Sequence, residues 1–338
     1  MKQRTGKSLV WLAVVIMMLG ILAGCGPGSP ASTEGAQAPT VPTAQTGAKG
    51  DSVQYPLTVK DFSGNELTLA HKPERIVSLT LGTDEMLLSL VESGRIQALS
   101  GKIAEDEGIS NVAAEAKSFR KAENNIETII SLQPDLVFAA SWMKKEQIQQ
   151  LRDARIQVYL YGTATNLDEQ KKVILEIARL VGEPAKGQAV VADMDKTLQR
   201  VADKVKGIQP ENRLTVLDYN SFGSTKGKGT GFDDIAQRAG LINVAAQAGL
   251  TGYPKISKEK IVELNPDVIV LPSWSYDKKQ DPTNLAADLK KDQSLATVKA
   301  IKNNRVFMLP DKHMVSVSQY MALGVEDLAK AAYPDLFK

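Results

Sequence analysis

Two glutamates and two tryptophans stand at the same spacing in two separate parts of the chain. Glu127 precedes Trp142 by the same number of residues as Glu259 precedes Trp274. Indoles stack on large, flat or partly apolar ligands, and paired carboxylates suit a partner that carries two basic pockets. Each type also has a structural use, because a tryptophan at a strand end often packs in the core and a glutamate in a first helical turn complements the helix dipole. Their recurrence at one spacing favours a functional interpretation.

These four residues belong to a duplicated segment. The stretch ETIISLQPDLVFAASW, 127–142, aligns without a gap to EKIVELNPDVIVLPSW, 259–274, with seven identities where roughly one is expected. Each copy predicts a short helix capped by Asn124 or Ser257, a stop at Pro-Asp, and a buried strand that ends at Ser-Trp. Open α/β sheets bind ligands at the carboxyl ends of their strands, so each copy places an indole beside such a crevice.

The remaining pattern predicts two α/β lobes joined by one long helix. A hairpin, a buried strand and a helix capped by Thr83 precede the first copy, and further helices and a strand follow it. The helical pattern over 185–206 is about 33 Å long at 1.5 Å per residue, enough for a stiff connection between lobes. Around the second copy a similar strand and helix series is predicted, with a helix over 288–301, a strand over 305–309 and a terminal helix over 318–332.

The amino terminus predicts export and lipid attachment. Three cations precede an apolar run over 9–23, which is shorter than the roughly 20 residues of a membrane span and indicates a signal peptide. The run ends in Leu-Ala-Gly-Cys, which resembles a bacterial lipoprotein processing site with Cys25 as the lipidated residue; ordinary cleavage is the alternative. Cys25 is the only cysteine, so no intramolecular disulfide is expected. The Gly-, Pro- and Ser-rich segment after it predicts a flexible tether.

Charge and missing motifs argue against several function classes. Without the leader cations, the 41 basic residues fall to 38 against 39 acidic ones, and no basic block favours nucleic-acid binding. The sequence contains no GxSxG, HExxH or Walker motif, so catalysis is disfavoured. Only His71 and His313 are present, which disfavours a His-rich metal site, and no cofactor is predicted.

These features together resemble a class III ABC-transporter substrate-binding lipoprotein, a family that takes up ferric siderophores, cobalamin and haem. The resemblance covers residues 55–338 and rests on the lipoprotein signal, the tether, the Pro-Glu-Arg-Ile-Val-Ser-Leu strand, the two Leu-x-Pro-Asp turns, the long helix and the Ala-Ala-Tyr-Pro-Asp-Leu-Phe terminus. It implies a class III periplasmic binding protein fold, with two Rossmann-like lobes joined by a single long helix. It also implies that Glu127 and Glu259 dock onto arginines of the permease.

The resemblance also suggests ligand contacts. Cobalamin-binding members carry Trp-Pro just before the second glutamate, where this chain has Tyr253-Pro254. Hydroxamate-siderophore binders use an arginine before the first glutamate, and Arg120 matches it after a one-residue shift. The predicted ligand site therefore comprises Arg120, Trp142, Tyr253, Trp274 and Tyr276. A haem ligand at His313, with Tyr253 or Met314 beside it, is an alternative.

The sequence thus predicts a monomeric, lipid-anchored protein on the extracytoplasmic face of the membrane. It captures an iron chelate, a ferric siderophore, and delivers it to an ABC permease and its ATPase. Cobalamin or haem are alternative ligands of the same transporter class, and a lipid-anchored enzyme or a sensory lipoprotein is an alternative of another class. The predicted parts are a signal peptide (1–24), the lipidated cysteine with its tether (25–54), an amino-terminal lobe (55–182), an inter-lobe helix (183–208) and a carboxyl-terminal lobe (209–338). The helix is expected to hold the lobes nearly rigid.

Overall fold

The computed structural model describes residues 52–277 and 281–338. The predicted signal peptide, Cys25 and most of the predicted tether lie outside these ranges. All elements below belong to the compact unit Lys49–Lys338. Within the described residues, no helix combines the length and apolar character needed to cross a membrane.

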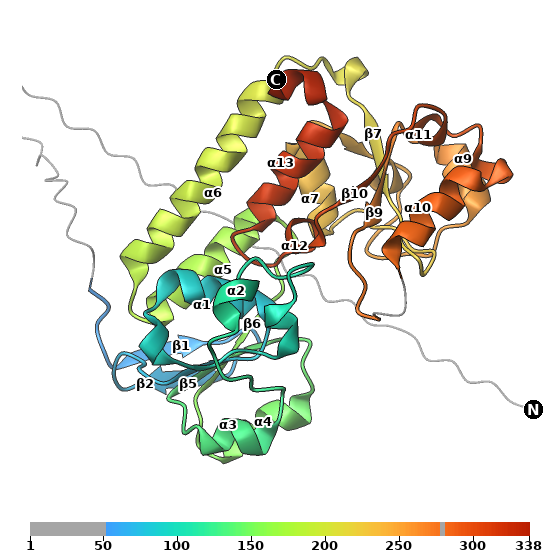
Figure 1. The fold of residues 1–338 in the computed structure, drawn as a ribbon. Coiled ribbons are helices and arrows are strands. Elements are labelled where there is room, and N and C mark those ends of the chain that lie inside the picture. The colour runs from blue at the N-terminus through green and yellow to red at the C-terminus, as the bar shows by residue number, and fades with distance from the viewer. Residues whose placement is uncertain (1–51, 278–280) are drawn as a thin grey trace, which may run out of the picture. The chain divides into compact units, whose positions relative to one another are not determined.

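Two four-stranded parallel sheets form the centres of the two lobes (Figure 1). The first sheet has the order β4-β3-β5-β6 and contains β3 (Ile76–Ser78), β4 (Ile96–Ala98), β5 (Leu136–Ala140) and β6 (Val158–Tyr161). The second has the order β10-β9-β7-β8 and contains β7 (Thr215–Asp218), β8 (Ile242–Asn243), β9 (Val268–Pro272) and β10 (Val306–Leu309). The predicted hairpin is confirmed as β1 (Leu57–Lys60) paired with β2 (Glu66–Leu69).

The two sheets share one topology and one register. In each, the first strand lies between the second and the third, and the fourth strand lies beyond the third. Ile76 pairs with Leu136 in the first sheet, and Val216 pairs with Val268 in the second. Leu136 and Val268 are aligned positions of the duplicated segment, so the duplication extends from the sequence to the pairing of the strands. The predicted fold class, α/β with two Rossmann-like lobes joined by a long helix, is confirmed.

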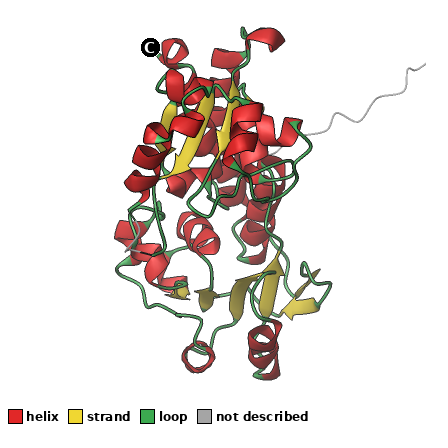
Figure 2. Cartoon of the chain, turned by 90° about the vertical axis from the view of Figure 1, so that its right-hand side faces the viewer, coloured by secondary structure: helices red, strands yellow, loops and turns green. Residues whose placement is uncertain are grey.

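Helices cover both faces of each sheet (Figure 2). Those of the first lobe are α1 (Leu81–Leu90), α2 (Ala113–Ala116), α3 (Ile126–Ser131), α4 (Lys145–Asp153) and α5 (Leu167–Leu180). After α6 (Pro184–Val205), the second lobe contains α7 (Gly231–Arg238), α8 (Val244–Gln247), α9 (Lys258–Leu264), α10 (Pro282–Lys291), α11 (Lys299–Lys302), α12 (Asp311–Met314) and α13 (Met321–Ala332).

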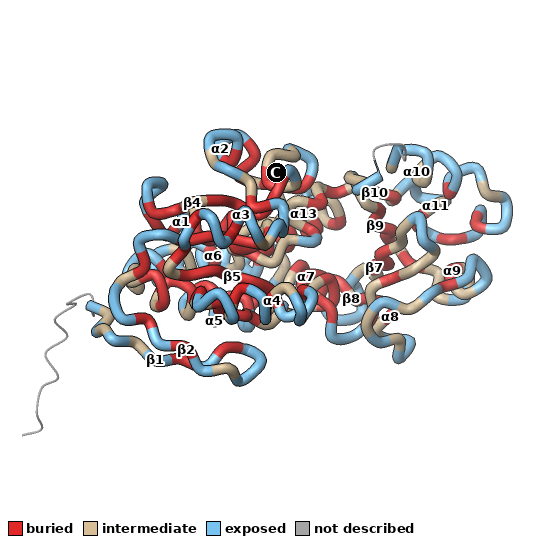
Figure 3. The backbone as a smooth tube through the Cα atoms, turned by 90° about the horizontal axis from the view of Figure 1, so that it is seen from below, coloured by how far each residue is buried: buried red, intermediate tan, exposed pale blue. Residues whose placement is uncertain are grey.

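Alternate residues of the central strands enter different hydrophobic cores. Leu136 and Phe138 pack into the large core that also contains α5, α6 and α13, whereas Val137 and Ala139 pack into the core under α3 and α4. The strands therefore appear as buried segments along their length (Figure 3). This two-sided burial explains why the sequence shows continuous apolar runs instead of alternation.

The helix starts in the duplicated segment need one correction. Ser257 caps α9 as predicted, because its side chain accepts the Lys260 N–H. The cap of α3 is Asn125, which accepts the Thr128 N–H, and the prediction of Asn124 was wrong. Asn124 has a left-handed backbone with φ of 52°, unlike the extended backbone of an N-cap. Asn125 is the position that aligns with Ser257, so the two caps are equivalent.

Two other helix predictions also differ from the structure. The cap of α1 is Thr80 instead of Thr83, because the Thr80 side chain accepts the Thr83 N–H. The helix predicted over 288–301 is interrupted after α10. There the Asp292 side chain accepts the Ser294 N–H and starts a short 3-10 turn, an interaction that competes with continuing the helix.

The aspartate of each Pro-Asp pair fixes the first strand of its lobe. The Asp135 carboxylate accepts the N–H groups of Glu74 and Arg75, at 2.7 and 3.0 Å, just before β3. The Asp267 carboxylate accepts the N–H and hydroxyl of Thr215, at 3.0 and 2.7 Å, at the start of β7. These bonds hold the beginning of the first strand against the third strand in both lobes.

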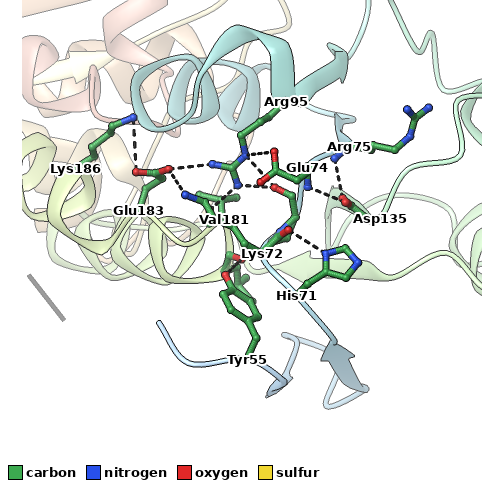
Figure 4. Close-up of polar contacts among 12 residues, drawn as sticks. Tyr55, His71, Lys72, Glu74, Arg75, Arg95, Asp135, Val181, Glu183 and Lys186 are labelled. Atoms are coloured by element: carbon green, nitrogen blue, oxygen red, sulfur yellow. Dashed lines mark hydrogen bonds and ion pairs between the residues drawn. The ribbon is translucent and has the colours of Figure 1, made fainter. Parts of the chain in front are cut away.

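The long helix α6 packs on α5 of the first lobe and on α13 of the second. Its 22 residues correspond to about 33 Å. Figure 4 shows how its start is attached to the first lobe: the Glu183 carboxylate lies 2.7 Å from Lys72 Nζ and 3.0 Å from Arg95 Nη1. Burial raises the pKa of Glu183, but Lys72 and the other neighbouring cations outweigh it, so the pKa is lower than usual.

Polar contacts also join the two lobes directly. Glu85 of α1 accepts hydrogen bonds from the Asn111 N–H at 2.9 Å and from the Ser318 hydroxyl at 2.5 Å. Asn111 also donates through Nδ2 to the Lys312 carbonyl at 2.7 Å. Because Glu85 and Asn111 belong to the first lobe and Ser318 to the second, these contacts fix one lobe against the other.

The predicted boundaries of the parts at 55, 183 and 209 stay predictions.

Candidate functional site

A cleft of about 900 Å³, the main cleft, is lined by residues of both lobes. Leu79 and Thr80 follow β3, Trp142 lies just beyond β5, and Trp274 lies just beyond β9. The cleft therefore lies at the carboxyl ends of strands in both sheets, beside the point in each where the strand order reverses. The other lining residues include Gly82, Glu85, Lys102, Asp106, Glu123, Tyr161, Tyr276, Asp311 and Val317.

The two indoles of the duplicated segment both line the main cleft, one from each lobe. Trp142 is 68% exposed, so a ligand has access to most of its surface. Trp274 is half-buried, and its ring meets the ring of Tyr276 edge to face with centroids 6.1 Å apart. Tyr276 also lines the cleft and is exposed. Aromatic surface from both lobes is therefore available to one ligand.

Contacts with both lobes fix the position of Trp274. Its Nε1 donates to Asp106 Oδ2 at 2.9 Å, and its backbone N–H donates to Asp311 Oδ2 at 2.8 Å. A Cβ added at Gly108 would lie 2.6 Å from Trp274 Cδ1, so the indole approaches the backbone at a place where only glycine fits. Trp274 is thus oriented before a ligand binds.

Acidic side chains dominate the charge of the main cleft. Among its described lining residues, Glu85, Asp106, Glu123 and Asp311 are acidic and Lys102 is the one basic residue. Burial raises the pKa of Glu85 and of Asp311, and hydrogen bonds only partly offset that effect. A raised pKa reduces the negative charge of Glu85 and Asp311, so the carboxylates of Asp106 and Glu123 are the main reason that the cleft disfavours strongly anionic ligands and suits neutral or cationic ones.

The structure places two predicted ligand residues away from this lining. Arg120 is exposed and its carbonyl accepts the Leu99 N–H. Tyr253 is 71% exposed. Neither lines the main cleft as it stands, so their role as ligand contacts stays a prediction.

The predicted docking residues occupy equivalent exposed positions. Glu127 lies in the first turn of α3, and Glu259 lies in the first turn of α9. A hydrogen bond with its own backbone N–H, and then one with the Ser257 side chain, lower the pKa of Glu259. Both carboxylates are accessible to a partner, and docking stays a prediction.

The alternative haem ligand does not face the main cleft. His313 Nδ1 lies 2.6 Å from Asp327 Oδ2 of α13, and His313 is absent from the cleft lining. Met314 is buried and lines a smaller cavity described below. The described part of the chain contains no group of three or more His, Cys, Asp or Glu residues that could hold a metal ion.

Sequence reasoning missed several residues of the site. Tyr161 ends β6 and lines the main cleft, and the same signal that selected the tryptophans, an aromatic at a strand end, would have found it. Asp106 lies in a polar loop, and no local pattern indicated its contact with Trp274. Glu85 was detectable as a carboxylate within the apolar series of α1.

Comparison with known proteins agrees with this geometry. The model of the family described as "Periplasmic binding protein" matches residues 76–313, more than half of the chain. The chain therefore belongs to this family, as an extracytoplasmic substrate-binding protein of an ABC transporter with the class III fold.

Relatives of this chain are named as binding proteins, and solved structures share its fold. YvrC of Bacillus subtilis, an ABC transporter substrate-binding lipoprotein, is 29% identical over 352 positions that cover 100% of both chains. A cobalamin-binding protein of Halobacterium salinarum is 29% identical over 237 residues, which cover 70% of this chain and 63% of that protein. The structure of molybdate-bound MolA from Haemophilus influenzae has a TM-score of 0.66 at 24% identity and covers 83% of this chain and 92% of MolA. The apo haem-binding protein RhuT from Roseiflexus sp. RS-1 has a TM-score of 0.65 at 23% identity, with coverages of 78% and 99%.

Proposed function

We propose that this protein captures a ferric siderophore, specifically a neutral hydroxamate-type chelate, and delivers it to an ABC importer. The observation that carries the proposal is the main cleft, in which Trp142 and Trp274 from opposite lobes share a lining whose charge is mainly acidic.

The size of the cleft favours a large ligand. Small-molecule sites typically measure about 300–1,000 Å³, and the cleft of about 900 Å³ lies near the upper end. A bare metal ion or a small oxyanion would leave most of this volume unfilled and would not contact both indoles. A chelate brings its own donor atoms to the iron and presents apolar surface to the aromatic side chains.

The charge of the cleft selects among chelates. A ferric trihydroxamate is neutral, whereas ferric catecholate and citrate complexes are anionic. The carboxylates of Asp106 and Glu123 would repel the anionic complexes, with only Lys102 to offset them among the described lining residues.

Cobalamin is the second candidate ligand. It is large and carries no strong negative charge, and the 29% identical Halobacterium relative is named as a cobalamin-binding protein. Haem is less well supported, because its two propionates would meet an acidic lining and His313 is engaged by Asp327.

Delivery would use the two exposed glutamates and a lipid anchor. Glu127 and Glu259 begin equivalent helices in the two lobes, so they form a matched pair for two basic pockets of a permease. Lipidation of Cys25 would hold a monomer at the extracytoplasmic face of the membrane, next to the permease and its ATPase. The absence of catalytic motifs from the sequence supports binding over the alternative of a lipid-anchored enzyme.

Titration calorimetry with four compounds tests the ligand class. We expect submicromolar binding of ferrichrome, a neutral trihydroxamate, or of cyanocobalamin, and at least about tenfold weaker binding of ferric enterobactin and haemin. Preferential binding of an anionic compound would contradict the charge argument. No binding of any of the four would contradict the proposed function.

A further inference from the structure

A second cavity of about 240 Å³, which we call the side chamber, adjoins the main cleft and is lined mainly by residues of the second lobe. Four residues line both cavities: Ile109, Trp274, Asp311 and Val315. The two spaces therefore adjoin along these shared residues, and Trp274 is one of them. The side chamber is too small for a metal chelate, but it has room for a short chain of a few heavy atoms, since one water takes up about 30 Å³.

The side chamber lies where α/β sheets bind ligands. Asp218 is the last residue of β7, and Val270, Leu271 and Pro272 lie at the end of the adjacent strand β9. In this sheet β8 lies on one side of β7, and the next strand in the chain, β9, lies on the other side. The strand order therefore reverses between β7 and β9. Crevices outside such a reversal are the general ligand sites of open α/β sheets.

A buried carboxylate of the side chamber has an unused acceptor. The Asp218 side chain is 7% exposed, and its Oδ2 lies 3.0 Å from Lys226 Nζ. Its Oδ1 is buried, and the described residues provide no hydrogen-bond donor to it. Buried polar atoms are nearly always paired, because an unpaired one loses its hydration without compensation. Asp218 lines the side chamber, and a small rotation of its carboxylate would let Oδ1 accept a donor that arrives with a ligand.

The charges that neighbour Asp218 also favour a hydrogen-bond donor on the ligand. Lys226 lies 5.7 Å from the centroid of the Phe232 ring. Burial lowers its pKa, but the Asp218 carboxylate together with Asp311 and Tyr253 outweighs that effect, so the pKa is higher than usual and Lys226 stays a cation. Asp311 is the second carboxylate, and its Oδ2 accepts the N–H groups of Ser273 and Trp274. Two carboxylates thus accompany a single ammonium group among the described lining residues of the side chamber.

We propose that the side chamber receives a nitrogen arm that donates hydrogen bonds, with Asp218 Oδ1 as its acceptor, while the body of the ligand lies in the main cleft. The arm is an ammonium or a primary carboxamide, and a carboxylate arm is rejected. The inference rests on the proposed function, because it requires a large ligand between the lobes. It identifies the ligand as a chelate or corrinoid with a pendant N–H donor, a narrower class than neutral chelates in general.

Paired ligands that differ only in the arm test this inference. Ferrioxamine B, a ferric trihydroxamate with a pendant ammonium, is compared with its N-acetyl derivative, in which the charge is removed. Cyanocobalamin is compared with a monocarboxylic acid derivative, in which one side-chain amide becomes a carboxylate, for each of the separable isomers. Dissociation constants of the wild-type protein are measured by titration calorimetry at pH 7.5.

We expect the member with the ammonium or the primary carboxamide to bind about tenfold or more tightly in at least one pair, and the pair that shows the difference identifies the arm as ammonium or carboxamide. In Asp218→Asn the preference disappears, because Lys226 orients the amide oxygen toward itself and the amide NH₂ faces the arriving donor. Glu123→Gln is the matched control, since it removes a carboxylate from the main cleft without touching the side chamber. It should leave the preference unchanged.

Three results would overturn the inference. Equal binding of both members of each pair by the wild-type protein refutes the proposal that the side chamber receives the arm. The main cleft would remain the proposed ligand site. Loss of the preference in Glu123→Gln as well as in Asp218→Asn places the arm in the main cleft. Failure of the wild-type protein to bind any of the compounds refutes the proposed function and the inference that rests on it. The comparison of paired ligands uses the wild-type chain, so it holds even if Asp218→Asn does not fold.

Discussion

The carboxyl group of Asp84 is expected to make folding stability decrease as the pH rises. Asp84 lies in the first turn of α1, fully buried, and accepts the Ser100 N–H at 3.0 Å and the Ser100 hydroxyl at 2.5 Å. Burial raises its pKa from 3.8 to about 7, even though the hydrogen bonds from Ser100 and Ser78 lower it. The nearby carboxylate of Glu85 adds to the increase.

The sign and size of the effect follow from proton linkage. Because the folded state binds this proton more tightly than the unfolded state, the stabilisation is complete below about pH 4 and decreases as the pH rises toward 7. A difference of about three pKa units corresponds to about 4 kcal/mol at 25 °C. In Asp84→Asn the side chain is neutral at every pH and can still accept the Ser100 N–H. The free energy of unfolding of the variant minus that of the wild type should therefore increase by about 4 kcal/mol between pH 4 and pH 8.

Urea denaturation followed by circular dichroism at pH 4.5, 5.5, 6.5 and 8 measures this difference. Other carboxylates affect both proteins alike, so the difference isolates Asp84. Asp193→Asn, at an exposed carboxylate of α6 paired with Lys196, is the control and should run parallel to the wild type. Parallel curves for Asp84→Asn and the wild type would refute the reasoning.

Three further predictions concern transport, binding and motion. Glu127→Ala combined with Glu259→Ala should abolish uptake of labelled chelate by cells while leaving the dissociation constant unchanged, and normal uptake would remove the docking proposal. Gly108→Ala should weaken ligand binding by about tenfold or more, because the new Cβ would lie 2.6 Å from Trp274 Cδ1 and displace the indole. Gly94→Ala is the control, because its Cβ meets nothing within 4 Å. Equal affinities for the two variants would count against this contact. Small-angle scattering should show little change in radius of gyration on ligand binding, because α6 and the contacts of Glu85 connect the lobes, and a large closure would exclude a rigid connection.

The parts of the fold that local sequence determines were predictable. The duplicated segment predicted a helix, a Pro-Asp stop and a buried strand in each lobe, because apolar runs and proline act over a few residues. The position of the cap shifted from Asn124 to Asn125, since both are asparagines and only the backbone conformation distinguishes them. The break at Asp292 was missed because an aspartate can either sit in a helix or cap the next turn.

The residues that complete the site depend on contacts between distant parts of the chain. Trp142 and Trp274 were found because their spacing recurs. Asp106 accepts a hydrogen bond from Trp274 of the other lobe, and Asp218 accepts one from Lys226 in the side chamber. Neither contact has a signal in the local sequence. Arg120 and Tyr253 were taken from the family resemblance, which gives positions in the chain but cannot give the conformation of a loop.

Intrinsic fluorescence of the mature protein shows whether one ligand lies between the two indoles. The chain contains three tryptophans, and Trp11 belongs to the predicted signal peptide, so Trp142 and Trp274 alone report on binding after processing. We expect the ligand identified by calorimetry to quench emission in the wild type, in Trp142→Phe and in Trp274→Phe, with weaker binding in each variant. Quenching of one indole alone, with unchanged affinity when the other is replaced, would contradict a ligand held between the lobes.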